Sequence, residues 1–172
     1  MPKSFKLCLT MAGAVSAGSF TGGVLDYLIE TLTLWEEAKA TNRKLGVNHP
    51  EYNHSVPMHN VEIDVLSGAS AGGITGTLTL MSLLSKNHKP VNRSNPKGED
   101  NLFYKCWVKM ADDDKSKTLE KLLNTNDLSK NKIPESLLNS IAIDKIANEA
   151  LTINSEVRYP PFVSKDLDLI LT

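Results

Sequence analysis

A pentapeptide in the first half of the chain, Gly68-Ala69-Ser70-Ala71-Gly72, has the G-x-S-x-G pattern of a nucleophile elbow. A strand-like run over residues 61–66 precedes it, and a helix-like run over residues 74–84 follows it. A serine on such a sharp turn holds its hydroxyl clear of the backbone, and the turn needs minimal side chains two residues to either side. A plain turn of small residues would give the same pentapeptide, but the strand before it and the helix after it favour catalysis. We therefore predict that Ser70 is a nucleophile, with Gly68 and Gly72 forming its elbow.

A nucleophilic serine also needs N–H donors for the oxyanion that forms when it attacks a carbonyl. The backbone N–H of Ala71 lies at the predicted start of a helix, where the helix dipole also favours negative charge. A second loop of small residues, Gly13 to Gly18, follows an apolar strand-like run over residues 5–11 and opens another helix. Because the carboxyl ends of neighbouring parallel strands meet at one edge of a sheet, we expect the two loops to lie side by side.

The sequence does not identify a base for Ser70. A Ser-His-Asp hydrolase with this elbow has its histidine late in the chain. Three of the four histidines precede the elbow, only His88 follows it, and all occur in polar stretches typical of surface loops (the others are His49, His54 and His59). Their spacing does not match zinc-ligand patterns, and the acids at 112–114 are more typical of a helix cap or a solvated turn than of a cation site. We predict no metal and no cofactor.

Hydrophobic periodicity predicts an α/β fold with a mostly parallel sheet, because strands and helices alternate along the chain. We expect strands over 5–11, 61–67 and 166–172, long helices over 19–40 and 70–85, shorter helices near 100–110, 116–124, 134–140 and 143–151, and exposed polar connections over 41–60 and 86–100. On the first helix, the positions expected to face the core are Phe20, Val24, Leu28, Leu32 and Trp35, widened by Leu25 and Leu34.

The last predicted strand ends in an apolar run at Thr172 with no turn after it. We therefore expect residues 1–172 to be the N-terminal part of a single domain that continues beyond 172. Residues 3–25 also have the outline of a signal peptide with Val15-Ser16-Ala17 as its cleavage site, but glycines and hydroxyls interrupt the apolar run, which favours an uncleaved chain.

Composition excludes some classes of protein. Hydrophobic residues make up 41% of the chain and charged residues 23%, as in a folded globular protein, and a net charge of -1 argues against a nucleic-acid partner. The two cysteines, Cys8 and Cys106, lie in apolar runs. They are typical of small core residues in a reduced compartment, so we expect a cytoplasmic protein.

Four segments together resemble the patatin-like phospholipase family: Leu7-Cys8-Leu9, Gly13 to Gly18, Gly23-Val24-Leu25 and the Ser70 pentapeptide. The resemblance is strongest over residues 5–85 and weaker over 101–108 and 134–138. It implies a three-layer α/β/α sandwich, present here as its N-terminal portion, and a serine-dependent lipid acyl hydrolase. Ser70 matches the family's nucleophile, and Gly13, Ala14 and Val15 match the family's oxyanion loop. The family's base is an aspartate in a later D-G-A or D-G-G motif, which forms a Ser-Asp dyad without histidine.

This sequence departs from the family at three points. Val15 takes the place of the middle glycine of the loop, and Ala17 stands where the family often has Arg or Lys. No Asp is followed by Gly, so the dyad aspartate is absent from this chain, and we expect the chain alone to be inactive. The resemblance implies a lipid or acyl-ester substrate and allows transient contact at the periphery of a membrane. The oligomeric state stays open.

Three alternatives remain. The first is a non-catalytic relative that binds a lipid or a partner through the same cleft, favoured by the departures at Val15 and Ala17. The second is a dinucleotide-binding module, because Gly13 and Gly18 weakly match G-x-G-x-x-G, although no acid ends a second strand about 20 residues on. The third is a Ser-His-Asp esterase, which needs a histidine that this chain does not show.

Overall fold

The computed structural model describes residues 4–14, 18–108, 117–128, 133, 136–152 and 156–172. Its elements are, in chain order, β1 (Ser4–Met11), α1 (Gly18–Leu45), β2 (Asn60–Gly68), α2 (Ala71–Leu84), the π-helical turn η1 (Tyr104–Val108), α3 (Thr118–Leu122), α4 (Ile141–Leu151) and β3 (Val163–Leu171). The three strands form a parallel sheet in the order β1-β2-β3. The predicted α/β fold with a parallel sheet is confirmed.

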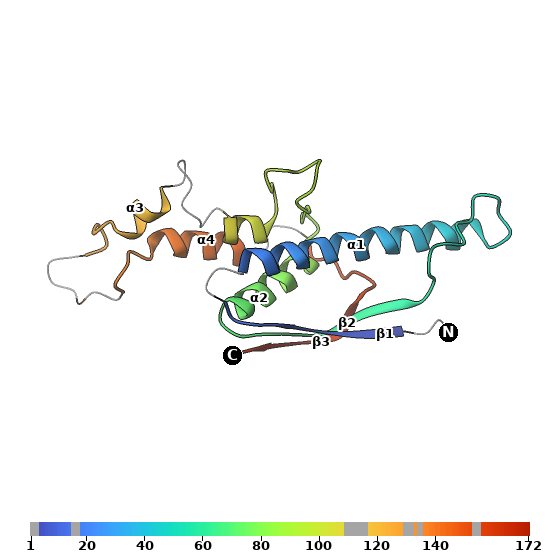
Figure 1. Cartoon of the computed structure of the whole chain (residues 1–172), viewed down its shortest axis with the longest axis horizontal. Helices are drawn as coiled ribbons and strands as arrows, with labels where there is room; N and C mark the ends of the chain where they lie inside the picture. The colour runs from blue at the N-terminus through green and yellow to red at the C-terminus, as the bar shows by residue number, and fades with distance from the viewer. Residues whose placement is uncertain (1–3, 15–17, 109–116, 129–132, 134–135, 153–155) are drawn as a thin grey trace.

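In the described part of the chain, the sheet carries one layer of helices. The helix α2 lies against all three strands, α1 packs on α2, and the labelled helices lie on the same side of the sheet (Figure 1). Each connection moves one strand further in the same direction, and right-handed crossovers that advance in one direction place their helices on the same face. The opposite face leaves Cys8, Thr10 and Asp168 exposed.

The sheet, α1 and α2 share one hydrophobic core. Side chains from α1 pack with those from β2, α2 and the segment around η1; the buried members are Met11, Leu25, Ile29, Leu32, Val61, Ile63, Leu66, Leu78, Leu83, Phe103, Cys106 and Phe162. In α2, the buried hydroxyls of Thr75 and Thr79 donate to the carbonyls of Ala71 and Thr75, four residues earlier, at 2.8 and 2.7 Å. These bonds allow polar side chains to be buried under α1.

The buried face of α1 matches the predicted one in part. Leu25 and Leu32 are buried, and Leu28 and Trp35 pack partly buried against the core, as expected. Phe20 is 75% exposed, and Val24 and Leu34 are exposed as well. The helix has two adjacent apolar stripes, and periodicity does not distinguish them. Gly18 and Gly22 lie on the same side as Leu25, and their lack of a side chain lets another segment approach closely there, which turns that stripe inward.

The first helix is also longer than predicted and holds part of the connection that follows it. Lys39, fully buried, donates from Nζ to the His59 carbonyl at 3.0 Å and pairs with a Glu36 carboxylate. The Asn42 side chain exchanges two hydrogen bonds with the backbone of Asn53, at 2.9 and 3.0 Å. The segment predicted as a fully exposed connection over 41–60 therefore begins as helix and is then tied back onto it.

The helices predicted after residue 100 are confirmed only in part. The helix expected over 143–151 is present as α4, and the one expected over 116–124 is the short α3. The segment near 100–110 contains η1, a π-helical turn, instead of a regular helix. Residues 136–140 of the helix predicted over 134–140 are not helical. The acids at 112–114 lie outside the described residues.

The two cysteines have different environments. Cys106 is buried in the core, as predicted, and burial raises the pKa of its thiol to about 11. Cys8 is exposed, so the prediction of a core residue is wrong: its side of β1 is the face of the sheet without helices.

We expect a thiol reagent at pH 8 to label Cys8 rapidly in the folded protein and Cys106 only after unfolding, because the reagent reacts with accessible thiolate. Counting labelled thiols with and without denaturant tests this difference. Cys8→Ser should remove the fast thiol. Rapid labelling that survives in Cys8→Ser would contradict the burial of Cys106.

Candidate active site

Ser70 lies in the turn between β2 and α2 with a strained backbone, as predicted for a nucleophile elbow. Its φ is 54° and its ψ is -123°, a region that a residue other than glycine adopts at a cost of about 1–3 kcal/mol. The Ser70 N–H donates to the Thr172 carbonyl at 3.2 Å, and the Thr172 N–H donates to the Gly68 carbonyl at 3.1 Å. The residue after β3 therefore holds the elbow in place.

The two glycines of the elbow have no room for a side chain. A Cβ on Gly68 would lie 2.3 Å from the Gly72 carbonyl oxygen, and a Cβ on Gly72 would lie 2.2 Å from the Met11 carbonyl oxygen. Both overlaps are with backbone, so rotation of a side chain could not relieve them. The spacing that defined the motif is therefore required by the close passage of β1, β2 and α2 at this point.

The first small-residue loop lies against the elbow. A Cβ on Gly13 would be 3.2 Å from both the Ser70 Cβ and the Ala69 carbonyl oxygen, and the Ala69 N–H donates to the Met11 carbonyl at 3.3 Å. The expectation that the two loops lie side by side is thus confirmed for residues 12–14. Gly13 is exposed beside the serine, and Ala14 follows it half-buried. Val15 and Ala17 lie outside the described residues.

The described part of the chain places an exposed serine hydroxyl beside backbone N–H groups, without a side chain that could act as its base. The Ser70 side chain is exposed and caps no backbone N–H of α2. Ala71 begins α2, and the first N–H groups of a helix have no acceptor within that helix, so the Ala71 N–H next to Ser70 is a candidate oxyanion donor. Residues 10–14 and 65–74 carry no charged side chain. Within the part of the chain that the structure describes, no carboxylate or imidazole is hydrogen-bonded to the Ser70 hydroxyl.

The chain is similar to the uncharacterized protein y4iI of Sinorhizobium fredii, with 29% identity over 174 residues. The match covers 98% of this chain and 23% of that protein, so the chain spans about a quarter of its relative's length. No family model matches the chain. No solved structure matches it.

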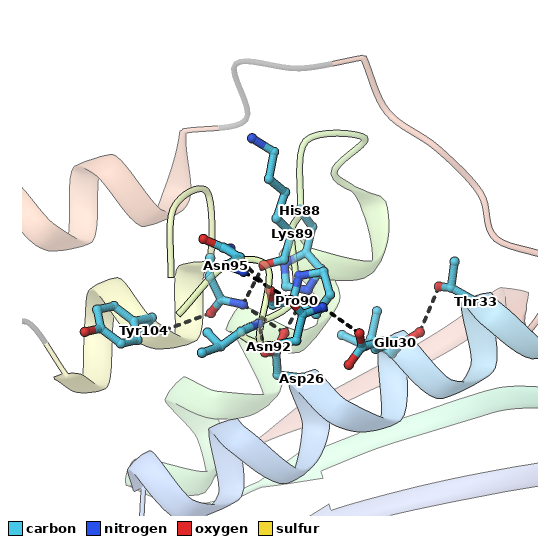
Figure 2. A network of polar contacts seen from close by, with 12 residues as sticks. Asp26, Glu30, Thr33, His88, Lys89, Pro90, Asn92, Asn95 and Tyr104 are labelled. Carbon is cyan, nitrogen blue, oxygen red and sulfur yellow. Dashed lines mark hydrogen bonds and ion pairs between the residues drawn. The ribbon is translucent and has the colours of Figure 1, made fainter. Parts of the chain in front are cut away.

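A second polar cluster, which the sequence did not predict, joins α1 to the loop after α2 (Figure 2). The buried Asp26 carboxylate accepts hydrogen bonds from the Val91 N–H and the Asn101 Nδ2, both at 2.8 Å, and its Oδ1 lies 2.9 Å from His88 Nε2. The Asn101 side chain in turn accepts the Tyr104 N–H at 2.9 Å. The cluster therefore ties the loop and the start of η1 to α1.

The prediction that all four histidines are on the surface is wrong for His88. Its side chain is only 2% exposed, because it packs on Phe103 as well as against Asp26. Among the described residues, no contact joins His88 to Ser70. Ser70 precedes α2, and His88 follows the other end of that helix, which is about 20 Å long. The Asp26–His88 pair is therefore a structural contact and not the missing base.

The hydrogen bonds of Asp26 make the free energy of unfolding depend on pH. Burial by itself raises the pKa of this carboxyl, but bonds from His88, the Val91 N–H and Asn101 together hold the pKa below its ordinary value. A carboxyl with a lowered pKa in the folded state contributes stability above its unfolded pKa of about 4, and that contribution disappears as the pH falls through the folded pKa.

We expect Asp26→Asn to lower the free energy of unfolding at pH 7 by about 2–3 kcal/mol, because hydrogen bonds to a buried charge are lost. The difference from the wild type should shrink as the pH falls below about 4. Urea unfolding between pH 3 and pH 7 measures it. Glu30→Gln is the matched control on the same helix, since an amide oxygen can still accept from Asn92 Nδ2. A pH-independent difference would show that the Asp26 charge is not responsible.

Two further properties bear on function. No helix within the described ranges is long and apolar enough to cross a membrane. In the same ranges, no group of three histidine, cysteine or acidic side chains is arranged to hold a metal ion.

Proposed function

We propose that the chain is the N-terminal part of a serine-dependent lipid acyl hydrolase of the patatin-like kind. Ser70 attacks the ester carbonyl, and the backbone N–H groups of the 13–15 loop and of Ala71 hold the oxyanion. The base is an aspartate outside this chain, which completes a Ser-Asp dyad. One observation carries the proposal: Ser70 has a φ of 54° between two glycines that admit no side chain, with Gly13 packed against it.

A structural turn does not account for this combination equally well. The chain has positive φ at two glycines, Gly46 and Gly98, and also at Asp100 and Lys117. Lys117 has a ψ of 39°, in the left-handed region that side chains tolerate best, whereas Ser70 has a ψ of -123°, outside that region. At Ser70 the strain is kept at a residue with an exposed hydroxyl, and Gly13 of the small-residue loop packs beside it. Strained residues of this kind are concentrated at active sites.

The same proposal includes the three-layer architecture and a cytoplasmic location. A second layer of helices, from residues outside the described part of the chain, would cover the open face of the sheet, since parallel sheets are normally covered on both faces. That layer would complete the three-layer sandwich.

We also propose that the enzyme is cytoplasmic, which is consistent with its two free cysteines. There it would reach acyl-ester lipids by transient contact with the membrane surface.

A fluorophosphonate probe tests this function against its main alternative, a relative that binds lipid without catalysis. The probe forms a bond only with an activated serine, so the full-length gene product should be labelled, and mass spectrometry should place the adduct on the Ser70 peptide. Ser70→Ala should abolish the adduct. An unlabelled full-length protein that still binds lipid vesicles would favour the non-catalytic alternative.

A further inference from the structure

A cavity of about 200 Å³ lies between the middle of α1, the loop after α2 and the segment that leads into β3. It is smaller than the pockets of drug-sized ligands, which measure about 300–1,000 Å³, so its volume suits a small molecule. Three apolar and three polar residues form most of its wall: Ile29, Leu34, Pro90, Glu30, His88 and Arg158. Figure 2 shows the members of this wall that come from α1 and from the loop.

His88 brings a buried polar atom without a partner to this cavity. Its side chain is only 2% exposed, and its Nδ1 has no hydrogen-bond partner. The other ring nitrogen, Nε2, lies 2.9 Å from Oδ1 of Asp26, which is not part of the cavity wall. Because the lowered pKa of Asp26 keeps its carboxylate ionised at neutral pH, a neutral imidazole holds its proton on Nε2. Nδ1 is then an acceptor, and an N–H or O–H group of a ligand would satisfy it.

Arg158 brings a cation to another part of the wall. Its Nε donates to the Leu83 carbonyl at 3.2 Å, and its backbone N–H donates to the Leu84 carbonyl at 2.8 Å, so the end of α2 holds this residue in place. Among the described residues, no carboxylate pairs with the guanidinium, and burial lowers its pKa. Its terminal NH₂ groups have the planar geometry that matches a carboxylate.

Glu30 adds a negative charge to the same wall. Its Oε1 accepts from Asn92 Nδ2 at 2.7 Å, which fixes the carboxylate against the loop. Within the described part of the chain, no ion pair joins Glu30 to Arg158, although both line the cavity. A cap on the last carbonyls of α2 would explain Arg158 alone. It would not explain why an anion, a buried acceptor and a cation surround one space beside aliphatic side chains.

We propose that this cavity binds a small monocarboxylic acid that carries an amino or hydroxyl group and an aliphatic chain. Its carboxylate pairs with Arg158, its N–H or O–H group donates to His88 Nδ1, and its chain lies against the apolar part of the wall. Amino acids and hydroxy acids share this chemistry, and the negative charge of Glu30 favours the ammonium group of the amino acid. The site does not depend on the proposed hydrolase function, because Ser70 does not line the cavity.

Calorimetric titration of the full-length gene product tests the site with molecules of nearly the same carbon skeleton. Leucine and its hydroxy-acid analogue, α-hydroxyisocaproate, should bind saturably, with leucine the tighter of the two. Isocaproate lacks the donor group and isopentylamine lacks the carboxylate, so each should bind at least about 10-fold more weakly than leucine. Equal binding of all four molecules, or no saturable binding of leucine and α-hydroxyisocaproate, would overturn the proposal.

Two variants and a control assign the charged contacts. Arg158→Gln should weaken the binding of leucine at least about 10-fold, because the carboxylate loses a charged donor. Glu30→Gln should weaken leucine more than α-hydroxyisocaproate, since only leucine carries an ammonium group. Glu37→Gln, at an exposed position on the same helix and outside the cavity wall, should bind leucine as the wild type does. An unchanged affinity of Arg158→Gln for leucine would contradict the assignment of the carboxylate contact.

Nuclear magnetic resonance of isotope-labelled histidine tests the His88 contact in the unmodified protein. Saturating leucine should shift the Nδ1 resonance of His88, because its lone pair gains a hydrogen-bond donor, whereas isocaproate should leave it in place. The signal is identified by its absence in His88→Gln. Ser70→Ala should show the same shift as the wild type, even if the protein has no esterase activity. If Arg158→Gln fails to fold, the shift still decides, and an Nδ1 resonance that leucine leaves unchanged would overturn the site.

Discussion

Ser70→Ala is expected to lower the kcat of ester hydrolysis by the full-length gene product at least about 1,000-fold, because in the proposed mechanism the acyl group is carried by the Ser70 hydroxyl. KM should change much less, since the hydroxyl contributes little to binding of the ground state. The fold should survive, because alanine keeps the Cβ and the Ser70 hydroxyl caps no N–H of α2. The measurement is steady-state hydrolysis of a short uncharged acyl ester, with circular dichroism to confirm folding.

Ser67→Ala is the matched control for the loss of a hydroxyl. Ser67 lies three residues earlier, near the end of β2. Its hydroxyl donates to the Thr10 hydroxyl at 3.0 Å, on the face of the sheet that α2 does not cover. Its removal should leave kcat within about 3-fold of the wild type, because the lost bond is an exposed one of modest worth. Equal activity of the wild type and Ser70→Ala would end the proposed mechanism.

Gly72→Ala is expected to be strongly destabilising. The new Cβ would lie 2.2 Å from the Met11 carbonyl oxygen and 2.8 Å from the Ala12 carbonyl oxygen, so β1 and α2 must separate. We expect the free energy of unfolding to fall by at least about 3 kcal/mol, because the backbone on both sides is fixed by the sheet. Urea unfolding followed by circular dichroism measures the change.

Gly23→Ala provides the comparison for a methyl group added to a helical glycine. Its Cβ would meet nothing within 4 Å, and alanine has the higher helix propensity, so this variant should be more stable than the wild type by about 0.5–1 kcal/mol. The two substitutions add the same atoms to helices of the same protein. Similar unfolding curves for Gly72→Ala and the wild type would contradict the close passage of β1 and α2 at the elbow.

The elbow could be predicted from the sequence because its determinants are local. Two glycines flank Ser70 at fixed spacing, and the strand before them and the helix after them are visible as hydrophobic patterns. The neighbouring position of Gly13 followed from topology alone, since both loops come after parallel strands. The strand, turn and helix around Ser70 and the position of Gly13 beside it are therefore confirmed, while the role of Ser70 as a nucleophile stays a prediction.

The Asp26 cluster could not be predicted in the same way, because its partners Val91 and Asn101 are 65 and 75 residues away in the chain. One signal was present: Asp26 is an acid between Leu25 and Tyr27, in the apolar part of a helix. A buried acid must be paired, and this one is satisfied by a loop whose composition predicted only surface exposure. The same loop carries His88 into the interior.

The core-facing side of α1 was predicted correctly at Leu28 and Leu32 but wrongly at Phe20, for a different reason. Phe20 and Leu25 belong to two apolar stripes of similar strength, and hydrophobic periodicity gives both the same helical repeat. The choice between them depends on Trp107, whose indole can approach only at Gly18 and Gly22. That information lies in a contact between segments about 90 residues apart, which a local pattern does not contain.

The most direct test of the central claim is to trap the acyl group on the enzyme. The full-length gene product is mixed with a short acyl ester and quenched in acid within the first turnover, and its peptides are weighed by mass spectrometry. We predict that the peptide containing Ser70 gains the mass of the acyl group and that no other peptide does. Turnover of the ester with the Ser70 peptide unmodified, or with the acyl group on another residue, would contradict the assignment of Ser70 as the nucleophile.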